Sequence, residues 1–228
     1  MKFASVDIET TGLDPEKDIV LEIAAGIGEV KPIGWIGPLG SDLTLAERAL
    51  IERHIYAPLD NEIRILVIPE GPITADLYIL AMHSRLWGEM SKFDKEMGKD
   101  KQVIKVSDSF FAVRKEKAWP IFRAWFKRVH PEGVMNCAGK NYAGFDARFL
   151  RRVDPSFDGI FRARIIDPAP LYYRGGDEKM PSTETCLERL KKEWPSMPTL
   201  EAHSALEDAR AVGWLVKAGL MRSPEVKA

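Results

Sequence analysis

Two carboxylates interrupt the apolar strand with which the chain begins. Ala4, Val6 and Ile8 alternate along this strand and share one face, which predicts that this face packs against a core. Asp7 and Glu9 are two residues apart, so their side chains point together from the opposite face. Adjacent carboxylates repel each other, and strands disfavour both residue types. An edge strand in solvent would tolerate the pair, but the apolar neighbours favour a central strand, where a bound cation explains the pair better.

Patterns typical of strands and helices alternate along the remainder of the chain. We expect strands at 2–9, 18–30, 63–68, 133–137 and 164–166, and helices at 41–55, 109–129, 144–153, 185–193 and 205–220. Pro120 is expected to break or restart the helix at 109–129, because proline cannot donate a backbone hydrogen bond inside a helix. Three strands followed by alternating helices and strands predict an α/β fold with a mixed five-stranded sheet flanked by helices.

The bulk composition is that of a globular protein. With 228 residues, 45% of them hydrophobic and 29% charged, the chain is long enough for one well-filled domain, which we expect to span residues 1–228. A net charge of −1 says little about partners, because acidic metal ligands would offset local basic patches. Two cysteines are too few for a disulfide framework, and neither a signal peptide nor an apolar run of roughly 18 residues is present. We therefore expect a cytoplasmic protein without a membrane partner.

His203 and Asp208 form a second candidate pair near the end of the chain. On one continuous helix, positions five apart point about 140° away from each other, too far for their side chains to converge. Ser204 and Glu207 have the spacing of a capping box, so the helix would begin after Ser204 and leave His203 on a loop. Taken singly, His203 and Asp208 are more often surface residues, and Asp146 is more often an ordinary helix position.

Together these segments resemble the motifs of the DEDDh family of 3′–5′ exonucleases, which includes proofreading exonucleases, oligoribonuclease and ribonuclease T. The first motif corresponds to residues 7–13, the second to Asn141, Phe145, Asp146, Phe149 and Leu150, and the third to His203, Ala205, Asp208 and Ala209. The motifs occur in the family's order with no expected ligand missing. The resemblance extends from residue 2 to about residue 220 and implies a ribonuclease H-like fold.

Two features depart from the family pattern. Asn141 stands one residue farther from Asp146 than in many members. The separation of Asp7 and Asp146 also exceeds that of the minimal family fold. We place the surplus in an insertion at about 31–60, between the second and third strands.

The resemblance implies a centre for two divalent cations. Its ligands would be Asp7, Glu9, Asp146 and Asp208, and the ions would be Mg²⁺ or Mn²⁺, because ligands that offer only oxygen suit hard cations. His203 would be the general base, since an imidazole titrates near neutral pH and can accept a proton from water.

The residues expected at the substrate lie in the first two motifs. Thr10 is a candidate contact to the terminal sugar, and Asn141 is a further candidate. Leu13 is a candidate wedge against the terminal base, although a leucine would serve the core equally well. His83 stands where some relatives carry a substrate-facing residue, but a structural histidine is the favoured interpretation. Five arginines near the second motif are candidates for phosphate contacts or for an ordinary solvated surface: Arg148, Arg151, Arg152, Arg162 and Arg164.

The leading hypothesis is a metal-dependent 3′–5′ exonuclease that hydrolyses single-stranded DNA or RNA by a two-metal mechanism. The alternative within enzymes is an oligoribonuclease-like scavenger of short RNA. A catalytically idle binding module of the same fold is the alternative outside enzymes, and it would be expected to lack at least one ligand. A replication protein and a second copy of the chain are the candidate protein partners.

Overall fold

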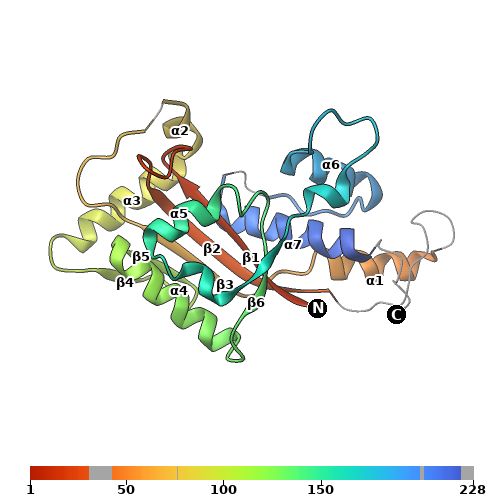
Figure 1. Ribbon diagram of the computed structural model, residues 1–228, viewed down its shortest axis with the longest axis horizontal. Coiled ribbons are helices and arrows are strands. Elements are labelled where there is room, and N and C mark those ends of the chain that lie inside the picture. The colour runs from red at the N-terminus through yellow and green to blue at the C-terminus, as the bar shows by residue number, and fades with distance from the viewer. Residues whose placement is uncertain (31–42, 76, 201–202, 222–228) are drawn as a thin grey trace.

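A seven-stranded mixed sheet forms the centre of the protein (Figure 1). The computed structural model describes residues 1–30, 43–75, 77–200 and 203–221. The strands are β1 (Lys2–Thr10), β2 (Val20–Glu29), β3 (Asp60–Val67), β4 (Val103–Lys105), β5 (Phe110–Val113), β6 (Met135–Ala138) and β7 (Phe161–Ile166). The helices are α1 (Leu45–Ile55), α2 (Leu77–Met82), α3 (Ser84–Met97), α4 (Lys115–Val129), α5 (Asp146–Val153), α6 (Thr183–Glu193) and α7 (Ala205–Met221), with short 3₁₀ helices at η1 (Phe157–Ile160) and η2 (Ala169–Tyr172).

β1 is an interior strand, as the sequence predicts. The strand order across the sheet is β4-β5-β3-β2-β1-β6-β7. β1 pairs antiparallel with β2 and parallel with β6, and β7 continues the sheet parallel to β6. The five predicted strands correspond to β1, β2, β3, β6 and β7, so the prediction of an α/β fold with a mixed sheet is confirmed.

The expected number of five strands is wrong, because β4 and β5 extend the sheet beyond β3. β5 pairs parallel with β3, and β4 pairs antiparallel with β5. The segment Phe110–Val113 belongs to the helix predicted at 109–129. A short apolar run suits a buried helix as well as a strand, and pairing with the distant strand β3 decides between them.

The expected break at Pro120 is also absent, since α4 runs unbroken through this residue. Residue 120 of a regular helix donates its N–H to the carbonyl of Glu116, but Pro120 has no N–H, so this carbonyl is left without its helical partner. Both residues are exposed, so water can bond to the freed carbonyl. The buried side of α4, which includes Trp119 and Phe122, still packs against the sheet.

Helices cover both faces of the sheet. α4 and α5 pack on one face, against Val6 and Ile8 among others, while α3 and α7 lie over the other face (Figure 1). On that second face, Phe3 of β1 clusters with Val212 of α7. Alternate residues of a strand point to opposite faces, so Asp7 and Glu9 lie on the same side of the sheet as α7.

The described part of the expected insertion contains helix α1, which begins with a capping box between Thr44 and Glu47. Its buried residues, Ile51 and Ile55, join a second core with α6 and α7. The Tyr56 hydroxyl, just after α1, donates a hydrogen bond of 2.6 Å to a carbonyl at the end of α6. This part of the insertion therefore supports α6 and α7, while residues 31–42 lie outside the described ranges. Among the described helices, none has both the length and the apolar character needed to cross a membrane.

Candidate functional site

Three carboxylates meet where β1 passes under the first turn of α7. Asp7 and Glu9 project from β1, and Asp208 projects from α7. One oxygen from each of the three lies within 4.8 Å of the others. The two elements are held together close by, since the Ser5 hydroxyl donates a buried hydrogen bond of 2.7 Å to the Ala209 carbonyl. This hydrogen bond joins residues 204 positions apart in the sequence, so the carboxylates that it brings together come from opposite ends of the chain.

Asp146 lies near this group, in the opposite layer, but is not one of the three carboxylates whose oxygens lie within 4.8 Å of one another. It is the first residue of α5 and is 3% exposed. Burial raises the pKa of Asp146 to about 7. Burial and the negative charge of Asp146, followed by those of Asp208 and Glu9, also raise the pKa of Asp7 well above its usual range. The four predicted ligands are therefore close enough to repel one another.

The same forces act on the other two carboxylates. Burial and the charge of Asp208 raise the pKa of Glu9 to about 8. Burial raises the pKa of Asp208 to about 6, although the neighbouring His203 opposes this shift. Divalent cations would offset the repulsion within such a cluster, and its oxygen donors suit Mg²⁺ or Mn²⁺. The residues present therefore fit the expected metal ions.

His203 lies on the loop before α7, as predicted. Its side chain is exposed, and its backbone has a φ of 60°, which is uncommon for a residue other than glycine. Glu207, which the sequence suggests as part of a capping box, instead contacts Arg210 through its carboxylate. The N–H of Ala205 at the start of α7 is bound by the carboxylate of Glu22 in β2, at 3.0 Å.

Two residues beside the acidic cluster have no assigned role in the motifs. His83, just before α3, is 2% exposed, and its Nε2 lies 3.5 Å from a carboxylate oxygen of Glu9. Burial lowers the pKa of His83, and the charge of His203 adds to this effect. The centres of the two imidazole rings are 6.4 Å apart. Glu22 is the second residue, and its signal in the sequence is a lone glutamate within an apolar strand.

The predicted substrate contacts flank the cluster. The Thr10 hydroxyl donates to the Gly12 carbonyl at 2.6 Å, so it braces the turn after β1. Leu13 on this turn is 79% exposed, which leaves it free to meet a ligand and excludes a core role. Asn141 is exposed with a φ of 55°, and its N–H donates to Asp167 at 2.9 Å. The roles of these residues in substrate binding stay predictions.

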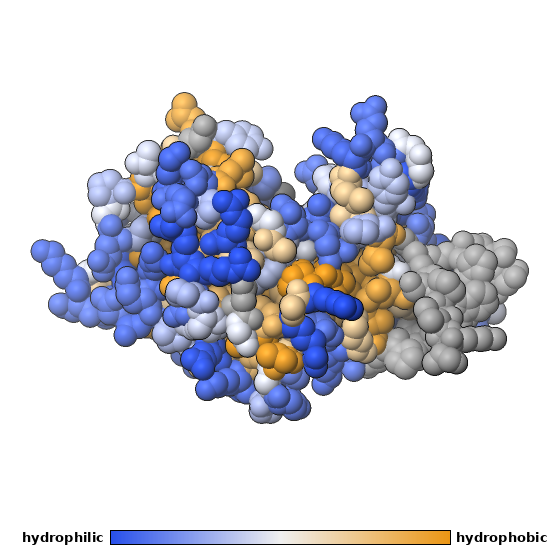
Figure 2. Space-filling model, in the orientation of Figure 1, coloured by the Kyte–Doolittle hydropathy of each residue, from blue (hydrophilic) through white to orange (hydrophobic). Residues whose placement is uncertain are grey.

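A cleft of about 600 Å³ opens onto the cluster. Asp7, His203 and Asp208 lie in its wall, and the opposite wall comes from α6 and the segment 197–200. Lys140 and Lys191 also line it, and so place positive charge within reach of a bound anion. Figure 2 shows the surface hollowed between the side of the molecule that carries α2 and the side that carries α6. The five arginines near the second motif do not line this cleft.

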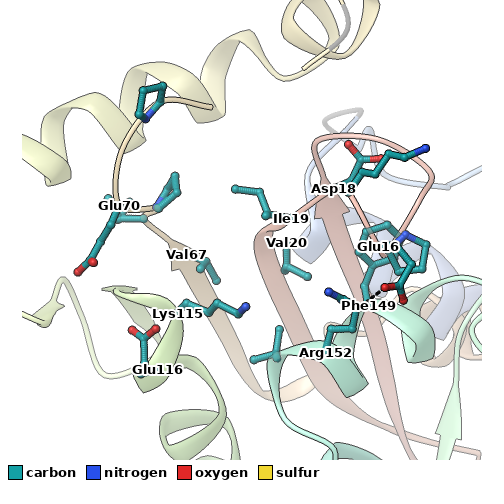
Figure 3. A pocket seen from close by; sticks show the side chains of 16 residues that line it. Glu16, Asp18, Ile19, Val20, Val67, Glu70, Lys115, Glu116, Phe149 and Arg152 are labelled. Carbon is teal, nitrogen blue, oxygen red and sulfur yellow. Dashed lines mark hydrogen bonds and ion pairs between the residues drawn. The ribbon is translucent and has the colours of Figure 1, made fainter. Parts of the chain in front are cut away.

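A second cavity, of about 380 Å³, lies away from the acidic cluster (Figure 3). It is bounded by the turn after β1, the end of β3, the start of α4 and the end of α5. Its rim mixes both charges, and Arg152 pairs with Glu16 at 2.5 Å on one side of it. None of the five predicted metal and catalytic residues lines this cavity, so it is separate from the candidate site.

Searches of protein-family models and of curated proteins find no match to this sequence. Solved structures, in contrast, match over nearly the whole chain. The nuclease domain of 3′hExo, a DEDDh family member bound to rAMP, aligns with a TM-score of 0.56 and 13% identity, covering 96% of this chain and 91% of that one. The cell-death related nuclease CRN-4 aligns with a TM-score of 0.56 and 11% identity, covering 96% of this chain and 63% of that one.

A zinc-bound complex of E. coli ExoI with single-stranded DNA also aligns, with a TM-score of 0.51 and 16% identity. The alignment covers 98% of this chain but 41% of that one, so this chain spans less than half the length of ExoI. At sequence identities this low, the similarity shows a shared fold alone. The chain has the fold of the DEDDh 3′–5′ exonucleases.

Proposed function

We propose that the protein is a metal-dependent 3′–5′ exonuclease acting on single-stranded nucleic acid. The observation that carries this proposal is the convergence of Asp7, Glu9 and Asp208 within 4.8 Å, with Asp146 beside them. The fold shared with 3′hExo and ExoI supports it. The 3′hExo structure contains rAMP and the ExoI structure contains single-stranded DNA, so RNA and DNA are both candidate substrates for this chain.

The four carboxylates are the proposed ligands of two Mg²⁺ or Mn²⁺ ions. Such ions, when bound, activate water and stabilise the charge that develops on the phosphate and the leaving oxygen. The contribution of the chain is to hold the carboxylates at fixed positions on β1, α5 and α7. All four predicted ligands and His203 are present in the sequence, which favours an enzyme over an idle binding module.

His203 is the proposed general base. It lies on the wall of the cleft beside Asp208, where its imidazole is exposed to water. His203 and Asp208 are close enough to interact electrostatically, since His203 opposes the upward shift in the pKa of Asp208. An imidazole at this position can act as a general base toward a water molecule in the cleft.

The cleft between α6 and α7 is the proposed path of the strand. Lys140 and Lys191 would contact phosphates, which positions a strand without reading its sequence. Apolar side chains in the same wall, Leu187 and Met197 among them, offer contact area for a base or sugar. The exposed Leu13 is the proposed wedge at the terminal base.

Digestion of end-labelled oligonucleotides tests this function. We expect 5′-labelled single strands to shorten stepwise in Mg²⁺ or Mn²⁺, and 3′-labelled strands to release labelled mononucleotide. EDTA should stop both reactions. A series of DNA and RNA lengths from the dinucleotide upward would define the substrate. Endonucleolytic products, or cleavage that persists in EDTA, would contradict the proposal.

Substitutions separate the proposed roles. Asp7→Asn should abolish cleavage, because it removes a ligand while retaining the volume of the side chain. His203→Ala should lower kcat by roughly 10²–10⁴ while Mn²⁺ binding persists. Glu16→Gln is the matched control, since this carboxylate lies at the separate cavity and should leave activity unchanged. Full activity in Asp7→Asn would eliminate the ligand assignment, and loss of Mn²⁺ binding in His203→Ala would make that residue a ligand.

A further inference from the structure

A fifth carboxylate lies beside the acidic cluster without being one of its predicted ligands. Glu22 of β2 stands directly opposite Glu9 of β1 in the sheet and is 0% exposed. Its charge repels Asp7, Glu9 and Asp208 and raises the pKa of each. Burying another negative charge next to this cluster is unfavourable unless strong partners compensate for it.

Both oxygens of Glu22 are already occupied. Oε1 accepts a hydrogen bond from Nε of Arg64, and Oε2 accepts one of 3.0 Å from the N–H of Ala205. These bonds direct both oxygens toward Arg64 and the start of α7, and Glu22 is not among the three carboxylates with an oxygen within 4.8 Å of one another. Glu22 therefore holds neighbouring elements in place, and the elements it joins are β3, through Arg64, and the start of α7.

Arg64 ties Glu22 to a second helix. Its Nη2 donates a hydrogen bond of 2.6 Å to Glu89 of α3, and its guanidinium stacks 4.4 Å from the ring of Phe110 in β5. The arginine side chain is 12% exposed, so little water weakens these contacts. A continuous chain of charged hydrogen bonds thus runs from α3 through β3 and β2 to the start of α7.

The far end of this chain is the part of α7 that carries the predicted catalytic residues. The N–H groups of a first helical turn have no partner within the helix, and they attract an anion. Glu22 supplies that anion at Ala205, two residues after His203 and three before Asp208. The hydrogen bond from Ser5 to the Ala209 carbonyl holds the same turn from β1. The first turn of α7 is therefore held at two points, one on each of the strands beneath it.

We propose that Glu22, held in place by Arg64, is a positioning residue that sets the first turn of α7 against β1. Through this turn it fixes the distance from Asp208 to Asp7 and Glu9 and the place of the His203 loop. Glu22 contacts neither substrate nor metal. The inference rests on the proposed function, because it assigns the geometry of that same site.

Two substitutions within the Glu89–Arg64–Glu22 hydrogen-bond network and one matched control outside it test this role. Glu22→Gln retains the side-chain volume but loses the charge that Arg64 and the helix start attract. Arg64→Gln removes the other half of the pair. The control is Glu62→Gln, because Glu62 of β3 also binds α7 through a carboxylate, at Arg210 with distances of 2.5 and 2.7 Å, but away from Ala205. All three would be assayed for kcat, KM and Mn²⁺ affinity at a temperature where circular dichroism shows them folded.

We expect Glu22→Gln and Arg64→Gln to lower kcat at saturating Mg²⁺ by about tenfold to a hundredfold, with KM little changed, because the reacting groups are misplaced. Glu62→Gln should retain the kcat of the unmodified protein. Comparing Mn²⁺ affinity in Glu22→Gln and Arg64→Gln also distinguishes a positioning effect from a change in net charge near the site. Removing a negative charge weakens cation binding and removing a positive charge strengthens it, whereas misplaced ligands weaken it in both variants.

The proposal is overturned if Arg64→Gln binds Mn²⁺ more tightly and keeps its kcat, or if Glu62→Gln loses as much activity as Glu22→Gln. Should Arg64→Gln not fold, kcat of Glu22→Gln against Glu62→Gln decides the question alone. Mn²⁺ affinity, measured by calorimetry without substrate, keeps this test distinct from the test of the proposed function. If the unmodified protein cleaves no nucleic acid, weaker Mn²⁺ binding in both Glu22→Gln and Arg64→Gln still supports the positioning role, and unchanged binding overturns it.

Discussion

At the residue scale, the acidic cluster stores repulsion that a cation can relieve. Asp7, Glu9, Asp146 and Asp208 all have raised pKa values, and burial is the largest cause in each case. Protons and metal ions thus compete for the same oxygens. The competition makes the stability of the protein depend jointly on pH and on divalent cations.

The metal-free protein should lose stability as the pH rises from about 4, the ordinary carboxylate value, to about 8, the value reached by Glu9. A carboxyl group whose pKa is raised by folding holds its proton more tightly in the folded state, so stability is highest where the group is protonated and falls as it ionises. Mg²⁺ should therefore raise the Tm more at pH 8 than at pH 5. Thermal unfolding with Mg²⁺ or EDTA across this range checks the prediction. Asp7→Asn should show a smaller Mg²⁺ effect, and an effect of equal size at both pH values would contradict the competition.

At the scale of elements, α7 links the site to the rest of the fold. Its first turn carries Asp208, while the remainder of the helix is almost entirely buried. Lys217 lies in this buried part, 2% exposed, and its ammonium donates a hydrogen bond of 2.8 Å to the carbonyl of Ala57 beyond the end of α1. Burial lowers the pKa of Lys217 to about 8. α7 is thus tied to β1 and β2 at its start and to the α1 segment near its end.

The lowered pKa of Lys217 predicts a rise in stability at alkaline pH. Between about pH 8 and the ordinary lysine value near 10.4, the folded protein releases a proton that the unfolded chain retains, so the free energy of unfolding increases by up to about 3 kcal/mol. Lys217→Met should lack this increase. Urea unfolding at intervals from pH 7 to pH 10 measures the difference between the two proteins. Parallel curves for both would show that Lys217 does not titrate in this window.

At the scale of the whole molecule, one hydrophobic core supports a wall of the cleft and another lies away from it. One lies between the sheet and the α4–α5 layer. The other joins α1, α6 and α7, and α6 forms a wall of the cleft. Stability is shared by both cores, whereas the shape of the cleft depends directly on the second.

A matched pair of substitutions separates these relations. Ile51→Ala in α1 and Ile63→Ala in β3 each remove a buried isoleucine, at 2% and 1% exposure, and should each cost about 2–5 kcal/mol of unfolding free energy. Ile51→Ala should also raise KM for an oligonucleotide, because α6 loses its support. Ile63→Ala should leave KM unchanged. Equal KM values in the two folded variants would show that α1 supports stability alone.

Five of the seven strands and the shared face of Asp7 and Glu9 were predictable from the amino-acid sequence, because they follow from a period of two residues, a local property of the chain. The grouping of Asp146, His203 and Asp208 came from the resemblance to the DEDDh motifs, since neither period nor spacing singles these residues out. Three features could be seen only in the folded protein: Phe110–Val113 is a strand, His83 lies against Glu9, and Glu22 binds the start of α7. Each of these contacts joins segments distant in sequence, and local patterns carry no information about which distant partner a side chain will meet.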